Sequence, residues 1–295
     1  MSPSPSDRVR SGGAGASPIA LVLIGICSVQ LGAAIAKTLF DEVAPTTIVW
    51  LRLLSSALVL VAWARPSLRG RSRSDWLVVA GFAAALALMN WSIYQSFARI
   101  PLGIAVTIEF AGPLTLAVLG SRRPRDLLWV GLAGAGVVLL GVEPGTVTLA
   151  GVGFALLAGA AWASYILLSR ATGARWSGVD GLAVASAIAA VVLTPVTLGY
   201  AAVPDGPRIW LLGAAVGVLS SVIPYSCEIV ALRSLRPALF GVLMSIEPAA
   251  AALAGILVVH ESLGLLQWLA IACVVAASVG ATRTTRPDPA EVVSA

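Results

Sequence analysis

The sequence predicts an all-α polytopic membrane protein with ten transmembrane helices, arranged as two inverted five-helix repeats with both termini in the cytoplasm. Composition is the first reason, because the chain is 58% hydrophobic and 11% charged, with a mean hydropathy of +0.94. Such a chain has too little polar surface to cover a water-facing globule. The other two reasons are the spacing of its apolar runs and the placement of its arginines.

Ten apolar runs follow a Ser-, Pro- and Gly-rich segment at 1–17, which is predicted to be a disordered tail. Most of the runs have about 20 residues, the length that crosses a bilayer core. The first run also resembles a signal peptide, with AIA at 34–36 as the cleavage site. We interpret it as a retained helix because the run is long and each repeat needs five helices. The predicted spans are 18–40, 46–64, 76–98, 102–120, 127–142, 149–169, 179–202, 209–232, 238–259 and 265–282.

The arginines fall mainly in the loops on one side of the predicted membrane. That side receives Arg8, Arg10, Arg65, Arg69, Arg71, Arg73, Arg122, Arg123, Arg125, Arg170, Arg175, Arg233, Arg236, Arg283 and Arg286. The other side has only Arg99 and Arg208, with Lys37 near a helix end. The positive-inside rule therefore predicts cytoplasmic termini, and the net charge of +5 reflects orientation rather than nucleic-acid binding.

Ten spans divide into a first repeat at 18–145 and a second at 146–282, followed by a cytoplasmic tail at 283–295. Because each repeat has an odd number of helices, the second starts from the opposite face, and the two repeats are inverted. The tight connections at 99–101 and 233–237 predict antiparallel helical hairpins.

Glu109 and Glu247 are acidic residues deep in apolar spans, about half the chain apart, and each has a proline nearby, Pro113 and Pro248. A carboxyl group at this depth is costly and normally faces a polar cavity or a partner. Each proline also removes a helical hydrogen bond and frees a backbone carbonyl, which is tolerated only beside a cavity or a packed partner. Two such sites in two halves are typical of a transporter built from an internal repeat. The alternative is a structural hydrogen bond between helices from a protonated Glu.

Arg52 lies inside the second span, where it could bind a carboxylate or pair with a buried Glu, although its side chain could also extend to the interface. Lys37 is nearer a helix end and more readily extends outward, with Gln30 on almost the same face. Pro224 in the eighth span frees the carbonyl of Ser220 beside Tyr225.

The third span carries Asn90, Tyr94 and Gln95. Asn90 and Tyr94 share a helix face and could form one wall of a pocket. Polar side chains also hold membrane helices together, so packing is an equal alternative.

No cofactor, metal site or enzyme activity is predicted. Cys27, Cys227 and Cys273 lie in apolar spans and are interpreted as small buried hydrophobic residues. His260–Glu261 lacks the second histidine of a zinc protease motif, since Gly264 stands there. With one histidine and no suitable Gly–Lys run, the sequence also shows no Ser-His-Asp set, phosphate-binding loop or dinucleotide fingerprint.

Several segments resemble a known family. They are SVQLGAAIAKTLF at 28–40, TIVWLRL at 47–53, NWSIYQSFARIPLGIAVTIEFAGPLTLAVLGSRRPRD at 90–126, GAAWASYIL at 159–167 and PYSCEIVALRSLRPALFGVLMSIEPAAAALAGI at 224–256. Over essentially all ten spans, the chain resembles the bacterial threonine/homoserine exporters of the EamA group in the drug/metabolite transporter superfamily.

The resemblance implies an inner-membrane carrier with a central pocket that exports small amino acids or related metabolites by alternating access, as a proton antiporter. Its partners would be a small zwitterion, protons and the lipid bilayer. We expect Glu109 and Glu247 to meet the ammonium group or exchange protons, and Arg52 to meet the carboxylate. The alternatives are a general drug or metabolite exporter of the same superfamily and a non-transporting membrane scaffold or sensor.

Overall fold

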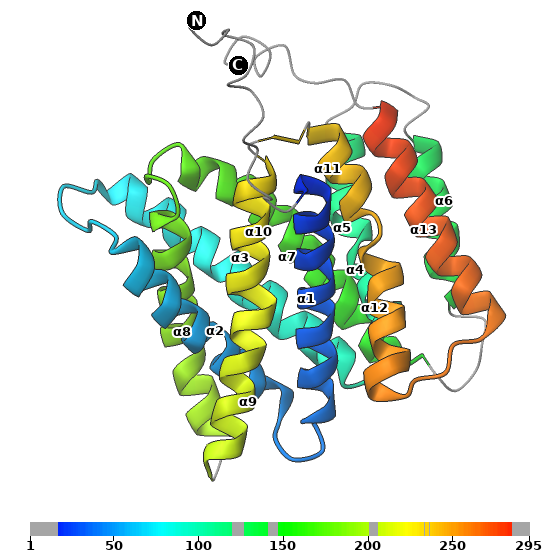
Figure 1. Cartoon of the computed structure of the whole chain (residues 1–295), viewed down its shortest axis with the longest axis horizontal. Helices are drawn as coiled ribbons and strands as arrows, with labels where there is room; N and C mark the ends of the chain where they lie inside the picture. Colours follow the sequence, from blue (N-terminus) through cyan, green and yellow to red (C-terminus); the bar gives the residue numbers. More distant parts are fainter. Residues whose placement is uncertain are drawn as a thin grey trace, which may run out of the picture.

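A computed structural model describes residues 17–119, 127–140, 147–200, 206–232, 234–235 and 237–284. Residues 1–16 of the predicted tail at 1–17, residues 285–295 of the predicted cytoplasmic tail at 283–295, the SRRPRD loop, and Arg233 and Arg236 lie outside the described residues. The described part is a bundle of helices that run roughly along one axis, with α1 in the middle of the view (Figure 1).

The helices follow one another with short connections. In chain order they are α1 (Pro18–Thr38), α2 (Pro45–Ala64), α3 (Arg73–Phe97), α4 (Leu102–Glu109), α5 (Ala111–Leu119), α6 (Leu127–Leu140), α7 (Leu149–Gly173), α8 (Asp180–Tyr200), α9 (Pro207–Gly217), η3 (Val218–Val222), α10 (Ile223–Leu232), α11 (Pro237–Met244), α12 (Glu247–Ala254), η4 (Gly255–Val259) and α13 (Leu265–Thr284). The elements η3 and η4 are single π-helical turns: η3 lies inside a longer helix, between α9 and α10, and η4 is the last turn of the span that contains α12.

Within the described residues, nine helical segments are long and apolar enough to cross a membrane, and α6 is a shorter apolar helix. Three of the nine are composite: α4 with α5, α9 with η3 and α10, and α11 with α12 and η4. The chain is therefore a polytopic helical membrane protein.

Local sequence explains where the helices begin. Pro18, Pro45 and Pro207 stand at the first turns of α1, α2 and α9, where no backbone N–H is needed. Ser72 and Asp75 form a capping box at α3, in which the Asp75 N–H donates to Ser72 Oγ at 3.2 Å and the Ser72 N–H donates to Asp75 Oδ2 at 2.9 Å.

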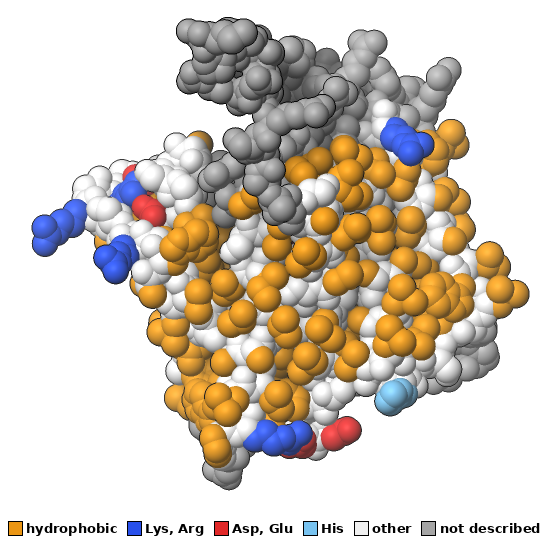
Figure 2. Space-filling view, viewed as in Figure 1, with side chains coloured by type: hydrophobic (Ala, Val, Ile, Leu, Met, Phe, Trp, Pro, Cys, Tyr) orange, Lys and Arg blue, Asp and Glu red, His pale blue; other side chains and the backbone are white. Residues whose placement is uncertain are grey.

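The outer surface is apolar along the middle of the bundle, and charged side chains lie near its two ends (Figure 2). Exposed leucines include Leu58 on α2, Leu77 on α3, Leu211 on α9 and Leu257 on η4. An apolar band between polar ends is the surface that lipid requires. We call the end where α1 begins and α13 ends the terminus side, and the other end the opposite side.

The main helix pairings join the first half of the chain to the second. Helix α1 packs against α10, α2 against α8, α3 against α7, α4 against α12, and α6 against α13. These pairings place residues from both halves around one centre, and that centre contains the candidate site.

Candidate transport site

A cavity of about 530 Å³ occupies the middle of the bundle and extends toward the terminus side. Its large apolar lining residues include Met89, Phe110, Trp162, Phe240 and Met244. The polar and charged lining residues are Gln30, Arg52, Asn90, Glu109, Tyr165, Arg170, Ser220, Tyr225, Glu228, Glu247, Ser278 and Thr282. A concave, largely apolar site with a few convergent polar groups is the usual form of a small-molecule pocket.

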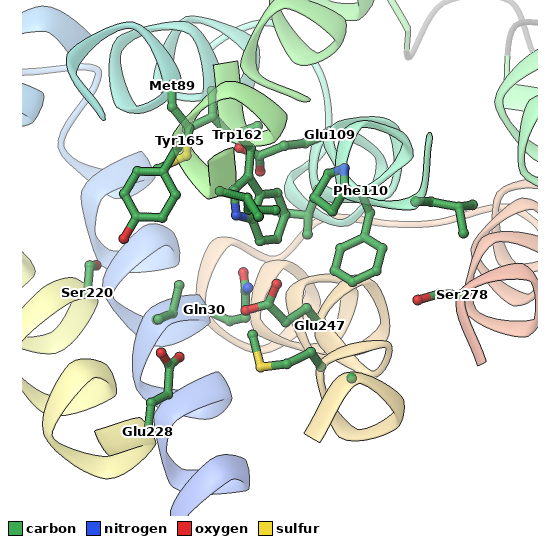
Figure 3. Close-up of a pocket in the computed structure, with 18 of the residues that line it drawn as sticks. Gln30, Met89, Glu109, Phe110, Trp162, Tyr165, Ser220, Glu228, Glu247 and Ser278 are labelled. Atoms are coloured by element: carbon green, nitrogen blue, oxygen red, sulfur yellow. The ribbon is translucent and has the colours of Figure 1, made fainter. Parts of the chain in front are cut away.

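Glu109 is the last residue of α4, and its side chain points into the cavity (Figure 3). Helix α5 begins at Ala111, so the fourth span is interrupted beside Glu109, and Pro113 lies in the first turn of α5. Proline at this position cannot donate the hydrogen bond that would use the carbonyl of Glu109. Glu109 is 8% exposed.

Glu247 occupies the corresponding place in the second half. Helix α11 ends at Met244 and α12 begins at Glu247, so this span is also interrupted at its glutamate, with Pro248 as the next residue. Glu247 is 7% exposed and lines the same cavity as Glu109. The two glutamates that the sequence singled out therefore share one site.

Glu228 on α10 is a third carboxyl group in this cavity, and the sequence analysis did not include it among the site residues. The side chains of Glu109, Glu228 and Glu247 all point into the cavity (Figure 3). Glu247 interacts electrostatically with both of the others. One feature of the sequence could have identified Glu228: it stands four residues after Pro224, and therefore one turn beyond an interrupted backbone.

Arg52 is the positively charged group at the closed end of the cavity. Its Nη1 donates to the Tyr94 hydroxyl at 3.3 Å, and its Nη2 donates to the carbonyl of Ser220 at 3.2 Å. This is the carbonyl that Pro224 leaves without a helical partner. No carboxylate of the described residues forms an ion pair with Arg52, although Arg52 interacts electrostatically with Glu109.

The remaining predicted residues fall into two groups. Gln30, Asn90 and Tyr225 line the cavity, and the Tyr225 hydroxyl lies 3.2 Å from that of Tyr165 on α7. Asn90 Nδ2 donates to the carbonyl of Leu86 at 2.8 Å, which fixes its amide against its own helix.

Tyr94, Gln95 and Lys37 do not line the cavity. Tyr94 is fully buried behind Arg52, with its ring 5.5 Å from the guanidinium carbon. Gln95 lies on another face of α3, where its Nε2 donates to Thr46 at 3.2 Å. Lys37 is near the opposite end of α1 and pairs with Glu261. The position of each residue in its apolar run predicted its depth in the membrane. It did not predict which neighbouring helix the side chain would face.

The interruption beside Glu109 is held by a close helix crossing. A Cβ added to Gly112 would collide with the carbonyl of Gly159 on α7, and a Cβ on Gly159 would lie 2.6 Å from the carbonyl oxygen of Glu109. Small residues allow this approach of two backbones in a membrane. Gly153, also on α7, has open space around its Cα.

We expect Gly159→Ala to destabilise the protein and Gly153→Ala not to. The first adds a methyl group against fixed backbone, and overpacking of this kind costs about 1–3 kcal/mol. The second replaces an unpacked helical glycine with alanine, which is neutral or slightly favourable. Thermal unfolding of the purified variants in one detergent measures both. Equal unfolding temperatures for the two variants would contradict the close contact between α5 and α7 at Gly159.

The fold and the central cavity, with its few convergent polar groups, define a polytopic membrane transporter. Residues 149–283 match the EamA-like transporter family. The threonine/homoserine exporter RhtA of Salmonella typhimurium is 41% identical to this chain over 280 residues, with 92% of this chain and 93% of the relative covered. The exporter of the same name from Escherichia coli is 39% identical over 279 residues, at the same coverage.

Two further similarities agree with this assignment. An uncharacterized transporter of Bacillus subtilis, YwfM, is 30% identical over 234 residues, which are 74% of this chain and 76% of the relative. A crystal structure that is 20% identical matches with a TM-score of 0.62 and covers 90% of this chain and 96% of that one, so the fold is shared. The chain belongs to the EamA-like transporter family.

Proposed function

We propose that this protein exports small amino acids of the threonine or homoserine type, or related metabolites, across the inner membrane in exchange for protons. The observation that carries the proposal is the cavity, in which Arg52 and the carboxyl groups of Glu109, Glu228 and Glu247 come together. A zwitterion presents one group of each sign to such a site. The two relatives named as threonine/homoserine exporters support this substrate class.

In this proposal Glu109 and Glu247 act on the ammonium group and on protons, while Arg52 meets the carboxylate. Three carboxyl groups in one cavity repel one another when all are charged, so the site gains stability from either a proton or a substrate ammonium group. A site that accepts one or the other provides the competition that antiport requires.

We further propose ten membrane crossings, with α6 as the fifth, in two inverted repeats. The helix pairings support this. If each of the first five spans is exchanged with its counterpart among the last five, the same set of pairings results. The α3–α7 contact exchanges with the α1–α10 contact, and the α2–α8, α4–α12 and α6–α13 contacts each map onto themselves. The interruptions at Glu109 and Glu247 correspond under the same exchange.

The described basic residues support cytoplasmic termini. On the terminus side lie Arg65, Arg69, Arg71, Arg73, Arg170, Arg175 and Arg283, and on the opposite side Lys37, Arg99 and Arg208. By the positive-inside rule the terminus side is cytoplasmic. The cavity extends toward this side, so the conformation described here faces the cytoplasm.

An ion pair closes the opposite side of the bundle. Lys37 Nζ lies 2.7 Å from Glu261 Oε1 and donates to the carbonyl of Ile100 at 2.7 Å, while the N–H of Leu102 donates to Glu261 Oε2 at 2.9 Å. These contacts join α1 and the start of α4 to the loop after η4. In an alternating-access cycle they form the outer gate and separate when the cavity opens outward.

We expect Lys37→Met to expose the cavity from the opposite side. The test is labelling of Ala33→Cys by a membrane-impermeant maleimide applied outside cells, in a background without Cys27, Cys227 and Cys273. Ala33 lines the cavity and is 4% exposed. The rate of labelling should rise, because the substitution removes the charge that holds Glu261.

The matched control is Arg208→Met, which breaks the exposed pair with Glu42 at the same end of the bundle. Exposed ion pairs contribute little, so labelling should not change. Equal labelling of the Lys37→Met and parent proteins would show that this pair is no gate.

The experiment that tests the proposed function is counterflow in proteoliposomes with a panel of labelled solutes, with and without a pH gradient. Counterflow of threonine and homoserine, together with accumulation driven by the gradient, is the expected result. The large apolar lining residues Met89, Phe110 and Trp162 favour a second candidate, export of larger amphipathic metabolites. The panel therefore includes aromatic compounds and purines. A protein that moves no solute of the panel would support a scaffold or sensor instead.

A further inference from the structure

Three buried polar atoms without a hydrogen-bond partner belong to residues of the central cavity. They are Gln30 Oε1, Arg52 Nε and Ser220 Oγ, all within the described part of the chain. Buried polar groups in proteins are nearly always hydrogen-bonded. Three exceptions around one cavity indicate a subsite that a ligand completes.

Ser220 is held firmly beside Arg52 by the π-helical turn η3. Within this turn the carbonyl of Leu219 accepts from Ser28 Oγ at 2.6 Å, and the carbonyl of Ser220 accepts from Arg52 Nη2 at 3.2 Å. Each of these donors comes from the first half of the chain. Isolated π-helical turns inside longer helices are frequent at functional sites.

Gly32 on α1 determines where the Ser220 hydroxyl can lie. A Cβ on Gly32 would collide with Ser220 Oγ and would lie 3.1 Å from the Cβ of Leu219. The glycine therefore lets the hydroxyl reach the backbone of α1, two residues after Gln30. Because Gln30 and Gly32 are two residues apart, they face different sides of α1, so the unpartnered atoms of Gln30 and Ser220 lie on different faces of this helix.

The three atoms differ in what they can bind. The Nε–H of Arg52 only donates, and together with the second N–H of Nη2 it forms a planar fork that matches a carboxylate. The Ser220 hydroxyl can donate to the same carboxylate. Gln30 Oε1 only accepts, and its side chain points into the part of the cavity that also holds Glu247 (Figure 3). Donors therefore lie on the side of α2 and η3, and acceptors lie on the side of α1 and α12.

We propose that Ser220 and Arg52 together bind the α-carboxylate of the substrate, and that Gln30 Oε1 accepts a hydrogen bond from its α-ammonium group. The inference rests on the proposed export of a zwitterion. It adds Ser220 as a specificity-determining residue and gives the substrate a direction in the cavity, with its carboxylate toward η3 and its ammonium group toward α12.

The test compares Ser220→Ala with Ser221→Ala in threonine counterflow, using 1-amino-2-propanol, which is threonine without its carboxyl group, as a competitor. Loss of a hydrogen bond to a charged group should raise the half-saturating threonine concentration about tenfold to a hundredfold in Ser220→Ala. Inhibition by 1-amino-2-propanol should not change, because that compound has no carboxylate. Ser221 does not line the cavity, so Ser221→Ala should behave as the parent protein.

Gly32→Ala is a second, independent variant, because it keeps every polar group and displaces the Ser220 hydroxyl. It should show the same selective loss for threonine. If Ser220→Ala does not give folded protein, Ser220→Cys retains the side-chain volume, weakens the donor and allows the same comparison.

Two failures are distinguishable. A parent protein that moves no amino acid would refute the proposed function. A parent protein that moves threonine, with a folded Ser220 variant of unchanged half-saturation, would overturn this inference alone. An equal loss for threonine and for 1-amino-2-propanol would also overturn it, because it would show a general effect on packing.

Discussion

Replacing Arg52 with glutamine is expected to reduce threonine transport by at least tenfold. The substitution removes the one cavity cation at the closed end, and a hydrogen bond to a charged group contributes about 1.5–3 kcal/mol. Since 1.4 kcal/mol corresponds to a factor of ten, loss of one such bond predicts a change of about tenfold to a hundredfold. The same substitution weakens the contacts to Tyr94 and to the Ser220 carbonyl.

Arg52→Lys should recover little of this activity. Lysine keeps the charge but has no planar fork, so it cannot reproduce the two contacts and also bind a carboxylate side-on. Arg99→Gln is the control, because Arg99 binds Gln95 on α3 outside the cavity. Initial rates of counterflow, with each variant at equal amounts in liposomes, measure the effect. Transport by Arg52→Gln at the parent rate would remove Arg52 from the site.

Glu247→Gln is expected to uncouple transport from the proton gradient. Glutamine retains the shape of the side chain but cannot exchange a proton. Glu247 is the preferred candidate because it interacts with Glu109 and Glu228, whereas Glu109 also interacts with the positive charge of Arg52. The variant should continue counterflow of threonine and lose accumulation driven by a pH gradient.

Measurements of both activities on one preparation separate coupling from folding. Glu42→Gln serves as the control, since Glu42 pairs with Arg208 at the exposed end of the bundle. The Glu109→Gln variant should lose counterflow as well as accumulation, because Glu109 is the cavity carboxyl group that interacts with Arg52, and its loss changes the site that binds the substrate. The opposite pattern, with Glu109→Gln uncoupled and Glu247→Gln inactive, would reverse the two roles.

The sequence located the main groups of the site because membrane burial makes polar residues conspicuous. Glu109, Glu247 and Arg52 stood out in apolar spans, and all three line the cavity. Glu228 stood out less, since it lies near a helix end where water is an ordinary partner. In each case the sequence predicted how deep in the membrane the residue lies, but it did not predict which helices surround it.

Ser220 is the clearest example of a site residue that the sequence alone does not reveal. A serine in an apolar helix is common, and most bond to their own backbone. Its importance comes from contacts with Ser28, Arg52 and Gly32, which are distant in the chain and belong to two other helices. Likewise, Lys37 and Glu261 are unremarkable at helix ends until the fold places their side chains 2.7 Å apart.

The sequence by itself therefore determined the class of protein, the order of its apolar helices and the presence of buried acidic and basic groups. These features depend on composition and on length along one axis, because an apolar solvent selects both. Only the tertiary structure decided which of those groups meet. Pairing between the halves brings α1, α2, η3 and α12 around one cavity, and distances between helices are not encoded in the spacing along any one of them.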